Sequence, residues 1–118
     1  MTSILDTIKQ MLGIDQTDTS FDSELIVFIN SALSTIQKIG VGVEGYKISG
    51  QTNTWFDFVG DRTDIEELKT NVYLRVRLIF DPPTNSFAVK AIQDQIDEGN
   101  FYLELYRTKP IIEEVLDE

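Results

Sequence analysis

The stretch that decides the fold is V-Y-L-R-V-R-L-I-F-D-P-P-T-N-S-F, residues 72–87. Its first half alternates apolar and polar residues as a half-buried strand does, and it stops at two prolines. Upstream, however, Thr63 and Glu66 have the spacing of a helix capping box, and the alternation does not extend over residues 66–69. Apolar residues recur from there on one helical face: Ile65, Leu68, Val72, Val76 and Ile79. We therefore predict a helix that ends near residues 80–81, because the residue before a proline avoids the α-helical conformation.

The residues that follow predict a corner and a further helix. Asp81, Pro82 and Pro83 are expected to form a rigid corner, since proline cannot continue the preceding helix. Residues 84–86 each offer a side chain that can cap the next helix. That helix carries its apolar residues at helical spacing: Val89, Ile92, Ile96, Leu103 and Tyr106. Gly99 is its predicted weak point, because glycine costs about 1 kcal/mol relative to alanine inside a helix.

Two more helices are predicted before this region. Ser3 can cap a short first helix, and Gly13 supplies its end. Asp22 has the position of a cap for a longer second helix, which Gly40 ends. The apolar residues of the second helix recur at helical spacing: Leu25, Ile29, Ala32, Leu33 and Ile36. The predicted fold class is a small all-α bundle of about four helices.

A long glycine-rich loop, residues 41–60, separates the second and third predicted helices. It has no helical period, and a short strand or β-hairpin around residues 46–48 stays open. Trp55, Phe56 and Phe58 are its most apolar part. Such aromatic residues either pin a loop to its own core or form a surface that faces a partner, and both interpretations stay open here.

The length of 118 residues predicts one domain, which we place at residues 1–110 and which includes the loop at 41–60. Residues 111–118 form a C-terminal tail after Pro110. The tail carries one apolar stripe: Ile111, Ile112, Val115 and Leu116. It is either a frayed end or a short amphipathic segment that docks onto a partner.

Charge and missing residue types exclude several classes of function. Ten basic and twenty acidic residues give a formal net charge of −10, which on average repels DNA. The chain has no histidine and no cysteine, so we expect no imidazole catalysis, no thiolate nucleophile and no zinc site. Neighbouring carboxylates such as Glu66 and Glu67 point about 100° apart on a helix and do not converge on a metal or a substrate. We therefore expect no enzyme activity, no cofactor and no metal.

The same features bear on location. No run of about 18 apolar residues is present, so we expect no membrane span. The N-terminus lacks the basic flank and apolar stretch of a secretory signal, and the absence of cysteine fits a reducing cytosol.

Three segments together resemble the head-tail connector (adaptor) proteins of tailed bacteriophages. They are K-T-N-V-Y-L-R-V-R-L-I-F-D-P-P-T-N-S-F-A-V-K-A-I, N-T-W-F-D-F and L-D-T-I-K-Q-M-L-G-I, at residues 69–92, 53–58 and 5–14. The resemblance implies a mostly helical subunit, made in the cytoplasm of the bacterial host and built into the virion at the head-tail junction. It implies a ring, commonly of twelve copies, between the portal protein and the next connector or tail component. The ring would extend the DNA channel, needs no cofactor and has no catalytic residues.

Two other classes of function remain as alternatives. An acidic chain can act as a monomeric inhibitor or DNA mimic that occupies a basic cleft of a host enzyme. The acidic field is interrupted here by cations: Arg62, Arg75, Arg77, Lys90 and Arg107. A carboxylate-metal hydrolase is disfavoured by the spacing of the acids.

The third predicted helix also indicates self-association. It is apolar over more of its surface than one helix usually turns inward: Val72, Leu74, Val76, Leu78, Ile79 and Phe80. We expect this surplus, with Trp55, Phe56 and Phe58, to be covered by a partner.

Overall fold

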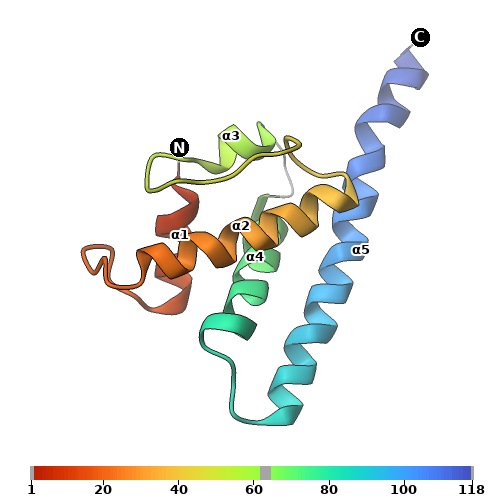
Figure 1. Ribbon diagram of the computed structural model, residues 1–118. Helices are drawn as coiled ribbons and strands as arrows, with labels where there is room; N and C mark the ends of the chain where they lie inside the picture. The colour runs from red at the N-terminus through yellow and green to blue at the C-terminus, as the bar shows by residue number, and fades with distance from the viewer. Residues whose placement is uncertain (1, 62–64, 118) are drawn as a thin grey trace.

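The computed structural model describes residues 2–61 and 65–117, and it describes the side chains of residues 2–61 and 65–105. These described residues form five helices, in the order α1 (Ile4–Leu12), α2 (Asp22–Ile39), α3 (Trp55–Val59), α4 (Ile65–Phe80) and α5 (Ser86–Asp117) (Figure 1). The described residues form no β-strand, and a single antiparallel bridge joins Ser3 to Thr54. The predicted all-α class is confirmed, and the β-hairpin left open for the glycine-rich loop does not form.

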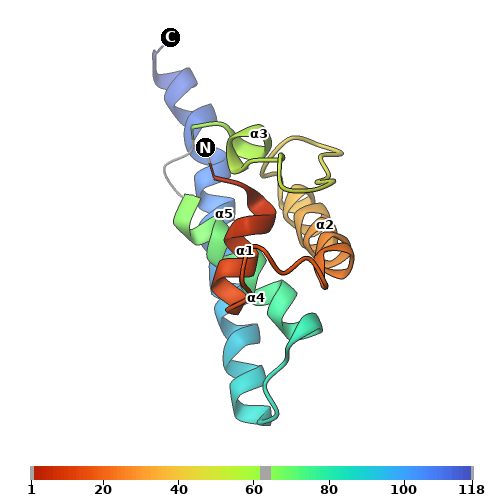
Figure 2. The same ribbon diagram turned by 90° about the vertical axis from the view of Figure 1, so that its left-hand side faces the viewer.

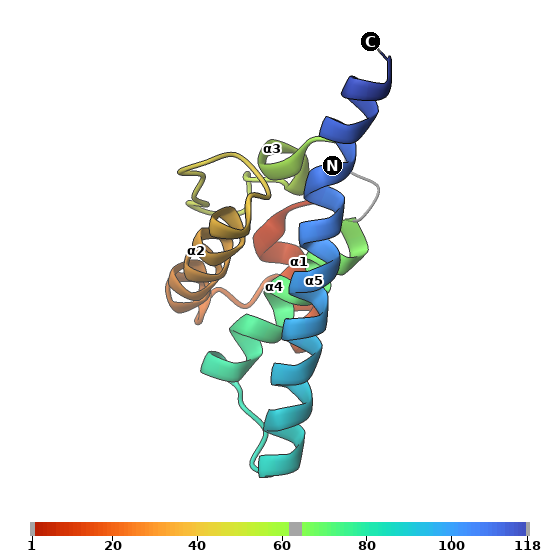
Figure 3. The same ribbon diagram turned by 90° about the vertical axis from the view of Figure 1, so that its right-hand side faces the viewer.

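Helix α4 is the centre of the arrangement, because it contacts α1, α2 and α5. Figure 2 shows α1 lying against α4, and α5 runs along one edge of the molecule (Figures 1 and 3). The 32 residues of α5 span about 48 Å at 1.5 Å per residue, close to the 51 Å length of the whole molecule. The C-terminal part of α5 therefore extends beyond the other helices (Figure 1).

The predicted ends of α1 are confirmed. The Ser3 hydroxyl accepts a hydrogen bond of 3.2 Å from the amide N–H of Asp6, as a helix cap does. Gly13 ends the helix in the left-handed conformation at φ 79°. Ile4, Leu5 and Ile8 point into the core.

The start of α2 differs from the prediction. The position before the helix is taken by Phe21, which makes no side-chain cap, and Asp22 is the first helical residue. The Asp22 carboxylate instead lies 2.9 Å from Nζ of Lys9, whose side chain is fully buried. Nζ of Lys9 also donates a hydrogen bond of 3.1 Å to the carbonyl of Gln16. The prediction that Asp22 caps α2 was wrong. Its carboxylate instead pairs with Lys9 of α1, because a buried lysine needs a counter-charge.

The glycine-rich loop is fastened to α2 by two side-chain amides. Asn30 both accepts from the N–H of Ile48 (2.8 Å) and donates to its carbonyl (3.0 Å), as a neighbouring strand would. Gln37 accepts from the N–H of Gly45 at 2.7 Å and donates to the carbonyl of Tyr46 at 3.0 Å. Some backbone N–H and C=O groups of the loop therefore form their hydrogen bonds with side chains of α2, and the loop forms no strand.

Helix α4 is confirmed, although the cap predicted at Thr63 lies outside the described residues. Leu68, Val72 and Val76 are buried against α1 and α2, as the predicted face requires. Ile79, the last residue of that predicted face, is 55% exposed.

The surplus apolar surface predicted on α4 is mostly covered within the subunit. Leu74 and Leu78 pack towards α5, and the Phe80 ring meets Phe21 edge to face at 5.3 Å. Of the six residues offered for a partner, Ile79 alone is exposed, so the partner prediction was too broad. Sequence spacing could not show this, because a helix between two neighbours buries more than one face.

Helix α4 ends at Phe80, before the two prolines. The amide N–H of Asp81 donates to the carbonyl of Arg77 at 2.9 Å and closes α4, while Pro82 and Pro83 follow outside any helix. Asn85 caps α5, because its side-chain oxygen accepts from the N–H groups of Phe87 (2.7 Å) and Ala88 (3.3 Å). Helix α5 then continues past Pro110 to Asp117.

The side chains of the predicted tail stripe lie outside the described residues: Ile111, Ile112, Val115 and Leu116. The backbone of residues 111–117 belongs to α5, and the stripe itself stays a prediction.

Candidate interaction surfaces

The acidic side chains of the described part of the chain do not build a catalytic or metal centre. No group of three or more carboxylates there converges as a metal site would require. Asp15 and Asp18 have pKa values below the ordinary value because each accepts hydrogen bonds from the residue two positions on, Thr17 and Ser20 respectively. These bonds stay within one surface loop and shape that loop.

The three aromatic residues predicted as a partner surface are divided by α3. Thr54 and Asp57 form a reciprocal capping box that starts this short helix. It turns Trp55 and Phe58 into the core, where the indole N–H of Trp55 donates to the Thr7 hydroxyl at 3.0 Å. Phe56 points the other way and is 45% exposed. Trp55 and Phe58 therefore anchor the loop to the core. Of these three aromatic residues, Phe56 is the one that a partner could contact.

Gly42 explains how Phe58 reaches its position. Its backbone has φ 85°, and a Cβ placed there would lie 2.3 Å from the Phe58 ring. The loop can approach this ring only with glycine at that position, since any side chain meets both strain and a clash.

A buried polar network joins α4 to α5. The guanidinium of Arg75 donates through Nε to Asn71 (2.8 Å) and through one Nη to Asn100 (2.7 Å). Asn71 is almost fully buried and donates to the carbonyl of Ile96 at 3.3 Å. Burial lowers the pKa of Arg75, while the charge of Asp97 opposes that shift. The network fixes the position of α5 along α4, because the polar side chains of the two helices form hydrogen bonds with one another.

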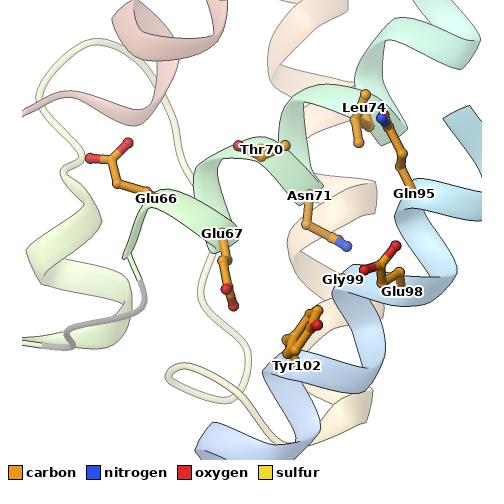
Figure 4. Close-up of a pocket in the computed structure, with 9 residues that line it drawn as sticks. All are labelled: Glu66, Glu67, Thr70, Asn71, Leu74, Gln95, Glu98, Gly99 and Tyr102. Atoms are coloured by element: carbon orange, nitrogen blue, oxygen red, sulfur yellow. The ribbon is translucent and has the colours of Figure 1, made fainter.

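Gly99 lies where α5 crosses this network. Figure 4 shows Asn71 pointing from α4 towards Gly99, and a Cβ on Gly99 would lie 2.8 Å from the Asn71 amide nitrogen. The glycine predicted as a weak point of the helix thus has a packing reason that the sequence did not reveal.

Among the residues that the structure describes, two grooves lie beside α5. The first, of roughly 350 Å³, lies between α4 and α5 and we call it the acidic groove (Figure 4). Its lining residues are Glu66, Glu67, Thr70, Asn71, Leu74, Gln95, Glu98, Gly99 and Tyr102. The second, of roughly 230 Å³, lies between α2, α4 and α5 and we call it the apolar groove. Its lining residues are Phe28, Ser31, Ala32, Thr35, Arg75, Leu78, Ile79 and Ile96.

The outer side of α5 carries exposed apolar residues that the sequence analysis did not single out. Phe101, Tyr102 and Leu105 are 60%, 40% and 48% exposed, and we call them the aromatic ridge. The rings of Phe101 and Tyr102 meet edge to face with centroids 5.8 Å apart. The sequence spacing could have predicted this ridge. Phe101 and Leu105 lie on one face of the helix, and Ile92, Ile96 and Leu103 lie on a different face. The predicted residues Trp55, Phe56 and Phe58 lie on α3, whereas this ridge lies on α5.

Comparison with known proteins gives a family. The described residues contain no helix long and apolar enough to cross a membrane. No curated protein and no solved structure matches the chain. The family of phage connector proteins matches residues 4–110, which covers α1 to α4 and most of α5. Such proteins are structural and not enzymatic, in agreement with the expectation from the sequence. The chain therefore belongs to the phage connector protein family.

Proposed function

We propose that this chain forms a ring at the head-tail junction of the virion, between the portal protein and the next connector or tail component. The observation that carries the proposal is the family match over residues 4–110, which implies a structural role at that junction. The ring extends the DNA channel and holds the portal on one side and the tail component on the other. The proposed number of twelve copies comes from the resemblance of the sequence to head-tail connector proteins.

The charge of the subunit supports passage of DNA without binding. A net charge of −10 per copy accumulates around a ring, so its channel repels the phosphate backbone. DNA then moves through the channel instead of being held there. The same charge opposes closure of the ring, and screening by salt weakens that opposition because the Debye length falls to about 3 Å at 1 M salt.

The C-terminal end of α5 is the second part of the proposal. Its backbone is helical to Asp117 and extends beyond the other helices (Figure 1). We propose that its apolar residues dock onto a neighbouring subunit or the portal: Ile111, Ile112, Val115 and Leu116. Phe56, exposed at the α3 end of the molecule, is proposed as a further contact with a partner.

Light scattering of the purified protein over a salt series, alone and with portal protein, tests the ring. We expect a monomeric or weakly associated protein at low salt and rings at high ionic strength or on the portal, which electron microscopy then identifies. A truncation after Pro110 is expected to stay folded and to assemble less well.

Two results would contradict the proposal. A protein that stays monomeric at high salt, at high concentration and with portal present is not a ring-forming connector. Tight binding to a basic host enzyme by such a monomer would favour the DNA-mimic alternative. Unchanged assembly of the truncated protein would show that residues 111–118 are not needed for assembly, and it would leave the proposed ring itself intact.

A further inference from the structure

Over residues 86–105, whose side chains the structure describes, helix α5 carries apolar residues on two opposite sides, and one of these sides is buried within the subunit. Ile92, Ile96 and Leu103 are buried against α4 and the main core. The aromatic ridge, defined above, lies on another side of the same helix, where Phe101 is 60% exposed and Leu105 is 48% exposed. A helix that is apolar all round is usually buried, so the ridge indicates a contact beyond the subunit.

The rings of the ridge are already arranged for contact. Phe101 and Tyr102 meet edge to face, a favourable geometry for aromatic pairs, so each ring restricts the other. A surface ordered before binding loses less conformational entropy when a partner covers it.

The apolar groove has the complementary character. Ile79, Leu78 and Ile96 give it an apolar lining, and Arg75 is its only charged residue. Within the described residues no carboxylate forms an ion pair with Arg75, although the charge of Asp97 acts on it, and its guanidinium donates to the neutral side chains of Asn71 and Asn100. On a chain with a net charge of −10, an apolar groove that holds a cation without an ion pair favours an apolar segment that carries a carboxylate.

The ridge supplies such a segment. Glu98 is exposed and lies three and four residues before Phe101 and Tyr102, so it shares their side of the helix. The Glu98 carboxylate therefore lies next to apolar rings on α5, and the Arg75 guanidinium lies next to apolar side chains in the groove.

The ridge cannot reach the groove of its own subunit. Tyr102 lines the acidic groove on one side of α5, whereas Ile96 lines the apolar groove on another. Two different, complementary surfaces on one chain make a heterologous contact, and such a contact repeated about an axis closes into a ring.

We propose that the aromatic ridge of one subunit inserts into the apolar groove of a second copy, with Glu98 facing Arg75 across the contact. This inference rests on the proposed ring and specifies the surfaces that build it. Glu98 and Tyr102, which also line the acidic groove, take part in this contact, whereas Phe56 remains outside it.

Three lysine substitutions test the proposal at matched charge: Phe101→Lys on the ridge, Ile79→Lys in the groove and Val43→Lys in the loop. The three positions are similarly exposed, and each change lowers the net negative charge by the same amount, which by itself favours assembly. We expect the first two variants to need at least about tenfold more protein to assemble, equivalent to about 1.4 kcal/mol. Val43→Lys is expected to assemble at least as readily as the parent. Thermal melts identify any variant that is not folded.

Cysteine pairs give a second readout, because the parent chain has no cysteine. We expect a mixture of Ile79→Cys and Phe101→Cys proteins to form a disulfide-linked dimer under assembly conditions, and neither protein alone to do so. This readout stays valid if a lysine variant fails to fold.

The outcomes separate this proposal from the ring itself. If the parent protein assembles, the two lysine variants assemble equally well and the mixed disulfide is absent, the ridge-groove contact is wrong and the ring stands. If the parent never self-associates, alone or on the portal, both are wrong.

Discussion

The body formed by α1 to α4 and the seam between α4 and α5 are packed in different ways. The main cluster, which draws on the body and on Leu103 of α5, is sealed, with no member more than 4% exposed. The cluster of the seam has only Leu74, Ile92 and Ile96, each 6–8% exposed, and it adds the polar network around Arg75. The body thus depends on apolar burial, whereas the seam combines a small apolar contact with specific hydrogen bonds.

This difference separates stability from assembly. A sealed core lets the body fold without a partner, since its apolar residues are already covered. Helix α5 is held by Leu103, by the small cluster and by the network, and its ridge residues stay exposed. Changes in the body should therefore lower stability first, and changes on the outside of α5 should lower assembly first.

The largest expected effect is at the centre of the body. Phe58→Ala should destabilise the subunit by about 3–5 kcal/mol, because it empties a fully buried aromatic site against Gly42. Urea unfolding followed by circular dichroism measures the change. Phe56→Ala, two residues away on the exposed side of α3, is the matched control and should have little effect. Equal losses for the two variants would show that α3 does not bury Phe58 as described.

The buried ion pair should respond unequally to its two partners. Asp22→Ala leaves the buried Lys9 charge without its carboxylate and should cost about 3 kcal/mol. Lys9→Met removes the buried charge, leaves Asp22 partly in water and should cost about 1 kcal/mol or less. Asp94→Ala breaks the exposed pair with Lys90 and should cost less than about 0.5 kcal/mol. Urea midpoints at neutral pH rank the three, and the reverse order for the first two would contradict the burial of Lys9.

Gly99→Ala probes the seam. In an ordinary helix this change would stabilise by about 1 kcal/mol. Here the added Cβ would lie 2.8 Å from the Asn71 amide, so we expect a loss of about 1–2 kcal/mol through overpacking. In an Asn71→Ala background the same change should recover its ordinary gain, and a double-mutant cycle measures the difference. Additive effects would mean that Asn71 and Gly99 do not touch.

The smallest effect is expected at the corner. Replacing Pro82 and Pro83 together with alanine should lower stability by about 1 kcal/mol, because the unfolded chain gains freedom at both positions. Thermal melts and light scattering measure the change. An unchanged melting temperature with normal assembly would contradict the role of the prolines as a rigid corner.

The sequence predicted the elements whose signals are local. Ser3 and Gly13 mark α1, Gly40 ends α2, and the prolines end α4, since caps and breakers act on their own neighbours in the chain. The helix α3 was missed because its capping box uses Asp57 and lies among glycines, where no helical period can develop over five residues.

What the sequence could not supply depends on pairs of elements. Asp22 resembled a cap, and only the fold brings it to Lys9. Asn71 and Gly99 are unremarkable in sequence until α4 and α5 cross at that point. The ridge on α5 is visible in the spacing of Phe101 and Leu105, but its exposure follows from which side of the helix meets α4.

The central claim is that the body folds alone and that the outside of α5 and the apolar groove carry assembly. Hydrogen exchange of the backbone amides, measured on the free subunit and on the assembled ring, tests it most directly. The account predicts that assembly adds protection in α5 around Phe101 and near the end of α4 at Ile79, with α1 already protected in the free subunit. Added protection confined to α1 or to residues 41–54, with none in α5, would contradict it.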